Sequence, residues 1–196
     1  LFRSYANHPS FALSLGPLQE RTMGVDSDED GEVNGAGTSF VNFSAGLNFR
    51  DNLRQAASDL IVLRKTIPEM GLFDASNISF VGHGIGASAG VLFLSQTNVN
   101  NLGVNSAILA SPLSGIARAL EDSASIGPTL KAGLAVFGGV LEGSSDYEAF
   151  FMALQTAVDP GDPINYGNQV TTPTLMFEMV GDGISVPSDI VYPIEY

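Results

Sequence analysis

The stretch of sequence that decides the fold is residues 78–90, which read Ile78-Ser79-Phe80-Val81-Gly82-His83-Gly84-Ile85-Gly86-Ala87-Ser88-Ala89-Gly90. The β-rich beginning of this stretch predicts a buried strand, and the small, apolar residues at its end predict a helix packed on several sides. A strand that turns through glycines into a helix presents the residue at the turn at the carboxyl end of the sheet. Flanking glycines are expected where a Cβ would collide with the neighbouring strand or helix. We therefore place a sharp turn at Gly84.

Segments on both sides of this stretch complete an α/β pattern. Upstream, apolar residues recur at helical spacing over residues 48–67, and Pro68 predicts the end of that helix. Downstream, Asn105–Ala110 and Thr174–Val180 are short apolar runs bounded by turn residues, which predict two further strands. Helices that alternate with buried strands favour parallel βαβ units. We expect an α/β fold with a mostly parallel sheet flanked by helices.

A long segment separates the second and third predicted strands. Residues 113–158 show a helical pattern broken by glycines, which predicts a helical cap inserted between residues 1–112 and 159–196. Within the cap, Ala132–Leu141 is apolar but too short to span a bilayer, and it fits either a mobile lid or an ordinary core helix. A second apolar group fits either acyl-chain contact or core packing, namely Phe150, Phe151, Met152 and Leu154.

The composition excludes several classes of protein. The 196 residues suit one domain, and 44% of them are hydrophobic, with a mean hydropathy of +0.19. The chain has 8 Lys and Arg against 21 Asp and Glu, and a net charge of −13 repels phosphate, so no nucleic-acid binding is expected. The absence of Cys excludes disulfides, thiolate zinc sites and a cysteine nucleophile. No apolar run reaches the ~18 residues of a membrane span, so no transmembrane segment is expected.

The turn and three other segments resemble a known family. Gly82-His83-Gly84-Ile85-Gly86 resembles the Gly-His-Ser-Leu-Gly nucleophile elbow of α/β-hydrolase lipases and esterases, with Gly84 where those proteins have serine. The remaining segments are similar to bacterial extracellular lipases of the Pla/Cef type, and they are Arg21–Asp26, Arg50–Ala56 and Asp162–Tyr166. The resemblance implies an α/β-hydrolase-like fold, a secreted or extracellular location, and hydrolysis of lipid or other acyl esters by a Ser, Asp, His triad.

Under this resemblance, Gly84 occupies the nucleophile position and the backbone N–H of Ile85 supplies one oxyanion donor. Asp182, which lies between two glycines after the third strand, is the expected acid, with Asp189 as the runner-up and a plain turn aspartate as the other reading of Asp182. Ser88 satisfies a second Gly-x-Ser-x-Gly frame and is the alternative nucleophile, although that frame requires glycines inside a strand. Because Gly84 has no side chain, the chain is expected to be inactive on esters.

The sequence offers no histidine at the place where this triad needs one. The triad runs in the order Ser, Asp, His in this fold, whereas His8 and His83 both precede the acid. We expect His8 in a surface loop and His83 directed away from the turn. The chain is therefore expected to be incomplete at both ends, with the base beyond Tyr196 and the first strands before Leu1. The alternative is a non-catalytic α/β-hydrolase-like binding or structural module.

Residues 26–37 form an acidic loop that predicts a structural Ca²⁺ site. Carboxylates at loop positions one, three and five, glycine at six and an oxygen ligand at nine match the first half of a calcium loop. Position twelve is Gly37 rather than the bidentate Glu of an EF-hand, so a merely solvated loop is the alternative. The candidate ligands are Asp26, Asp28, Asp30, Glu32 and Asn34.

Overall fold

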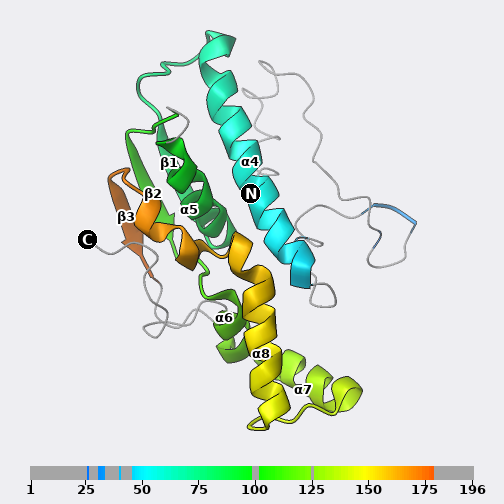
Figure 1. The fold of residues 1–196 in the computed structure, drawn as a ribbon. Helices are drawn as coiled ribbons and strands as arrows, with labels where there is room; N and C mark the ends of the chain where they lie inside the picture. Colours follow the sequence, from blue (N-terminus) through cyan, green and yellow to red (C-terminus); the bar gives the residue numbers. More distant parts are fainter. Residues whose placement is uncertain are drawn as a thin grey trace. The chain divides into compact units, whose positions relative to one another are not determined.

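The computed structural model describes residues 26, 31–33, 40, 46–98, 102–124 and 126–178 of the chain (Figure 1). The chain divides into two compact units, Leu1–Ser44 and Ala45–Tyr196. The helices and strands described below belong to the second unit. None of the helices among the described residues is both long enough and apolar enough to cross a membrane.

A three-stranded parallel sheet lies at the centre of the second unit. Its strands are β1 (Ser79–His83), β2 (Ser106–Ala110) and β3 (Thr174–Phe177), in the order β1-β2-β3. The register places Val81 beside Ile108 and Ile108 beside Leu175. Helices flank this sheet, so the expected α/β class with parallel strands is confirmed.

Helices α5 and α4 lie on one side of the sheet. Helix α5 (Ile85–Thr97) packs on β1 and β2, and α4 (Gly46–Met70) packs on α5 (Figure 1). Side chains alternate along a strand, and the face towards α5 carries fully buried Leu109. Leu53 of α4 and Leu94 of α5 are likewise fully buried. The core of this unit therefore lies between the sheet and its two covering helices.

Helix α4 differs from the expectation at its end. The sequence predicted that Pro68 would end the helix near Ile67, but α4 continues to Met70 with Pro68 inside it. A proline removes one backbone hydrogen-bond donor. In the last turn of a helix, the N–H groups that follow the proline can still donate to carbonyls of the preceding turn. The chain leaves the helix at Gly71, whose φ of +61° is a conformation that favours glycine.

The segment predicted to form a cap, residues 113–158, contains three helices beyond the carboxyl ends of the strands (Figure 1). They are α6 (Ile116–Asp122), α7 (Gly127–Gly138) and α8 (Ser145–Val158). Their shared core is formed by Ala117, Tyr147 and Phe151, against which Phe150 and Leu154 pack. Core packing therefore holds for three members of the second apolar group, whereas Met152 is exposed. Three short 3₁₀ helices, η1 (Asp159–Gly161), η2 (Pro163–Asn165) and η3 (Gly167–Gln169), then lead to β3.

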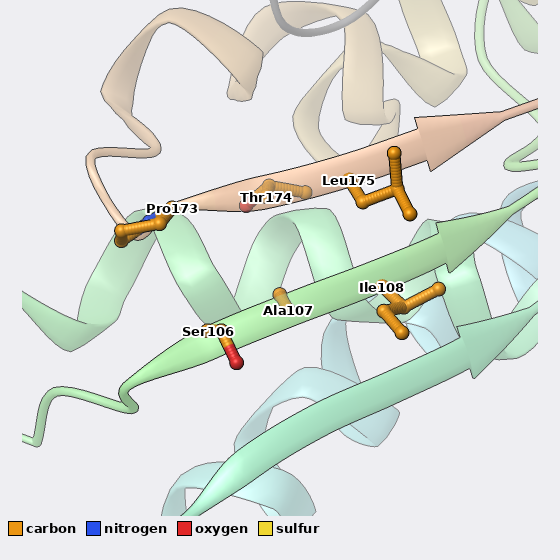
Figure 2. Close-up of a pocket in the computed structure, with 6 residues that line it drawn as sticks. All are labelled: Ser106, Ala107, Ile108, Pro173, Thr174 and Leu175. Atoms are coloured by element: carbon orange, nitrogen blue, oxygen red, sulfur yellow. The ribbon is translucent and has the colours of Figure 1, made fainter.

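The sheet face opposite α5 is open in the described part of the chain. Val81, Ile108, Leu175 and Phe177 alternate with the buried strand residues, and all four are exposed. A shallow groove of about 420 Å³ runs along β2 and β3 on this face, and Figure 2 shows the residues that line it. Since Ser106 and Pro173 stand at the amino ends of their strands, the groove lies at the opposite end of the sheet from Gly84.

Candidate functional site

The chain passes from strand to helix through a single residue. β1 ends at His83 and α5 begins at Ile85, and Gly84 between them has φ 54° and ψ −124°. The Gly84 N–H donates to the Ala110 carbonyl at 2.9 Å, and the Gly84 carbonyl accepts from the Ala87 N–H at 2.9 Å. A positive φ of this kind favours glycine. These contacts hold a sharp turn at the predicted position, at the carboxyl end of β1.

Only one of the two glycines that flank the turn is required by its surroundings. A Cβ on Gly82 would lie 2.7 Å from the Gly86 carbonyl oxygen and 2.8 Å from the Ala87 Cα, so no side chain fits. A Cβ on Gly86 would meet no atom within 4 Å. The expected steric requirement therefore holds for Gly82 and is wrong for Gly86, because only Gly82 lies under the first turn of α5.

The turn leaves room for a side chain at position 84. A Cβ built on Gly84 meets nothing within 4 Å. The Ile85 N–H is the first of α5, where helical N–H groups have no partner within the helix and favour negative charge. A polar atom carried at position 84 would therefore stand beside a backbone donor suited to an oxyanion.

Ser88 is buried one helical turn along α5 and is part of the packing. Its side chain is fully buried, its Oγ donates to the Leu113 carbonyl at 2.9 Å, and it accepts from the Leu113 N–H at 2.8 Å. The same Oγ lies 3.3 Å from the Gly84 carbonyl oxygen. A nucleophile needs an accessible oxygen, so this geometry favours the packing interpretation of Ser88 over the alternative nucleophile.

Sequence reasoning missed the conformation of Ser111. This residue follows the end of β2, is buried, and has a φ of +46°, which a residue with a side chain rarely adopts. Its N–H donates to the Phe177 carbonyl at 2.8 Å, so the ends of β2 and β3 remain joined beyond the sheet. Strained backbone of this kind concentrates at functional sites. Only the Ser-Pro sequence that stops the strand hinted at it.

Asp162 has a structural role within this chain. The Asp162 carboxylate is fully buried and accepts from the N–H groups of Gly115 at 2.9 Å and Ile116 at 2.6 Å. It also accepts from the Gln155 side-chain amide at 2.9 Å. An acidic side chain that satisfies the first N–H groups of a helix stabilises that helix. Asp162 therefore fixes the start of α6 against α8.

The remaining predicted site residues are only partly described. His83 ends β1 with an exposed side chain, whereas His8, Asp182 and Asp189 lie outside the described residues. In the acidic loop, the Asp26 carboxylate accepts from the Gly31 N–H at 2.9 Å. Glu32 is exposed, and the other candidate calcium ligands, Asp28, Asp30 and Asn34, fall outside the described residues. Across the described ranges, no three acidic or histidine side chains gather closely enough to hold a metal ion.

Comparisons with known proteins add no relative to this geometry. No family model, no curated protein and no solved structure matches the chain. A functional assignment therefore depends on the turn itself and on the residues that its backbone brings together.

Proposed function

We propose that this chain has the scaffold of a carboxylic-ester hydrolase of the α/β-hydrolase lipase type, inactive because Gly84 stands where the nucleophile would be. The observation that carries the proposal is the turn, in which one residue of positive φ joins a parallel strand to a helix. A parallel sheet flanked by helices is compatible with an α/β-hydrolase-like fold. Active sites of open α/β sheets lie at the carboxyl ends of the strands, where this turn lies.

The backbone around the turn suits acyl transfer. A serine oxygen at position 84 would attack the carbonyl carbon of an ester, and the negative charge would develop on the carbonyl oxygen beside the Ile85 N–H. Backbone hydrogen bonds hold the carboxyl ends of β2 and β3 beside the turn. The Ala110 carbonyl accepts from the Gly84 N–H, and the Ser111 N–H donates to the Phe177 carbonyl. Asp182 follows Phe177 by five residues, and we retain it as the proposed acid.

The proposed substrate class rests on the sequence resemblance and on the cap. Lipid or other acyl esters have apolar chains, and an enzyme that accepts them needs apolar surface near the reacting carbon. Helices α6, α7 and α8 lie beyond the strand ends (Figure 1), and they are our candidates for this surface. A secreted or extracellular location belongs to the same proposal and has the same resemblance as its support.

The substitution Gly84→Ser tests the proposal. The assay contains imidazole, which accepts the serine proton in place of the histidine that the chain does not supply. Over the background of imidazole alone, we expect the native chain to be inert and the variant to release a stoichiometric burst of p-nitrophenolate from a p-nitrophenyl ester at mildly alkaline pH, because the Ile85 N–H stabilises the oxyanion. Mass spectrometry after reaction with a fluorophosphonate in the same buffer should place the label at position 84.

Gly86→Ser is the matched control. It adds the same hydroxyl two residues away, at a glycine whose Cβ also meets no atom within 4 Å. We expect neither burst nor label in this variant. A folded Gly84→Ser chain that shows no burst and no label contradicts the proposal, and a label on Ser88 instead supports the other frame.

A non-catalytic binding or structural module is the second candidate function. The observation that favours it is the missing side chain at Gly84 itself, because the turn is built and yet carries no reactive atom. Calcium binding by residues 26–37 stays a prediction within this candidate. Isothermal titration with Ca²⁺, with Mg²⁺ as the control ion, measures it, and the loss of the heat in Asp26→Asn would locate the ion.

A further inference from the structure

Residues 111–115 connect the end of β2 to the start of α6, and we call them the connecting segment. Ser111 at one end has a φ of +46° and Gly115 at the other has a φ of +62°, so the backbone changes direction sharply at both ends. A residue with a side chain keeps a positive φ only where the surrounding contacts hold it. The contacts of the connecting segment therefore decide its path.

Ser88 of α5 holds the middle of the connecting segment. Its Oγ lies 2.9 Å from the Leu113 carbonyl oxygen and 2.8 Å from the Leu113 nitrogen. The same Oγ lies 3.3 Å from the carbonyl oxygen of Gly84. Because Ser88 is fully buried, the loss of these contacts would leave buried polar groups without partners. One hydroxyl thus joins the connecting segment to the residue at the turn.

Asp162 holds the end of the connecting segment that leads into α6. Its fully buried carboxylate accepts from the N–H groups of Gly115 at 2.9 Å and Ile116 at 2.6 Å. The side-chain amide of Gln155 in α8 donates to this carboxylate at 2.9 Å, and its oxygen accepts from the Ala117 N–H at 3.1 Å. A buried carboxylate is costly without such donors, so Asp162 and Gln155 fix the connecting segment from the side of α8.

We infer that the connecting segment couples α8 to the turn, so that Asp162 acts as a positioning residue for the backbone at Gly84. Ser88 holds Leu113 and Asp162 holds Gly115, with only Ser114 between them. Release of one contact lets the strained backbone relax and weakens the other, and Ser88 transmits the change to the turn. This coupling goes beyond the proposed function, because it concerns the native backbone and requires no reactive side chain at position 84.

Amide hydrogen exchange of the native chain and Asp162→Asn, followed residue by residue with NMR, tests the coupling. Asparagine keeps the shape of the side chain but puts an NH₂ group in place of one of the two accepting oxygens. We expect the N–H groups of Leu113, Gly84 and Ser88 to exchange about tenfold faster in the variant, because the connecting segment opens locally more often. Gln155→Ala, which removes the contact from α8, should give the same pattern at about threefold and replaces Asp162→Asn if that variant does not fold.

Ser144→Ala is the matched control. It removes a side-chain hydrogen bond at the opposite end of α8, where Ser144 accepts from the Tyr147 N–H at 3.2 Å. We expect the exchange of the Gly84 and Ser88 N–H groups to stay at the native rate in this variant. Unchanged exchange at the turn in the folded Asp162→Asn or Gln155→Ala chain overturns the inference, and so does an equal acceleration in Ser144→Ala.

A double-mutant cycle measures the same coupling as an equilibrium. Urea unfolding of Ser88→Ala, Asp162→Asn and the double variant gives the increase of the unfolding constant in each chain. Independent sites would give the double variant the product of the two single increases. We expect it to fall short of that product by about fivefold, because each substitution already frees the segment that the other residue holds. The full product contradicts the coupling, whereas a missing burst in Gly84→Ser contradicts only the proposed hydrolase, since neither measurement here uses ester chemistry.

Discussion

At the scale of single residues, the turn is defined by what each position can hold. Gly82 is required because the backbone of α5 passes too close for a Cβ, and Gly84 is favoured because its φ is positive. Gly86 satisfies neither condition. Ser111 shows the reverse case, a side-chain-bearing residue held at φ +46° by its neighbours. Strain and close approach thus meet at the carboxyl ends of β1 and β2.

The difference between the two flanking glycines can be measured. Gly82→Ala places a methyl group within 3 Å of backbone atoms of Gly86 and Ala87, so the helix has to move, and we expect a loss of about 2 kcal/mol in the free energy of unfolding. Gly86→Ala should be neutral or stabilising by up to about 1 kcal/mol, because alanine favours the helix. Urea unfolding of both variants checks this, and equal effects would contradict it.

The contribution of Tyr147 to the free energy of unfolding changes with pH in the alkaline range. Burial first, and then the hydrogen bond from its hydroxyl to the Glu121 carboxylate at 3.0 Å, raise the pKa of Tyr147 from 10.0 to about 12. The folded chain then keeps a proton that the unfolded chain releases above pH 10.0, so the contribution of Tyr147 is complete below that pH and is lost as the pH rises towards 12.

Thermal unfolding against pH tests this for the native chain and Tyr147→Phe. Below pH 10.0 the melting temperature of the native chain should exceed that of the variant by a constant amount, because only the native chain has the hydrogen bond. Between pH 10.0 and about 12 the difference should shrink, since phenylalanine has no proton to release. Two curves that stay parallel through this range would show that the hydroxyl does not titrate as expected.

At the scale of the elements, side chains join parts of the chain that the backbone leaves separate. Ser88 joins α5 to the loop after β2 through both polar groups of Leu113. Asp162 joins the start of α6 to α8 through Gln155. These contacts position the turn and the cap on the same sheet end. Each contact satisfies buried polar groups that would otherwise be costly.

The contact made by Ser88 predicts a large effect of a small substitution. Ser88→Ala leaves the buried Leu113 N–H and carbonyl without their side-chain partner, and we expect a loss of about 2 kcal/mol in the free energy of unfolding. Ser95→Ala is the matched control in the same helix, because the Ser95 hydroxyl donates to the Leu92 carbonyl and accepts from the Gln96 side chain, both of which belong to α5. Its cost should stay below about 1 kcal/mol. Calorimetry on the pair would refute the expectation if Ser95→Ala were the more damaging.

At the scale of the whole second unit, the sheet is covered on one face and open on the other. Helix α5 packs on one face and α4 packs on α5, while Val81, Ile108 and Leu175 are exposed on the opposite face. Parallel sheets are ordinarily covered on both faces. The cap lies beyond the strand ends and leaves the open face uncovered among the described residues (Figure 1).

The amino-acid sequence by itself determined the order of strands and helices and the place of the turn. Apolar periodicity reports burial directly, and the requirement for glycine at Gly84 is local backbone geometry. The same local reasoning failed at Pro68, because the cost of a proline depends on which turn of the helix contains it.

Only the tertiary structure decided which distant groups meet. Ser88 and Leu113 are 25 residues apart, and Asp162 and Ile116 are 46 apart, so no local pattern indicates either contact. The sequence also could not predict that α8 buries Phe151 and exposes Met152, because the two residues are neighbours and both are apolar. Such choices follow from how the helices pack on one another, and packing is a property of the assembled chain.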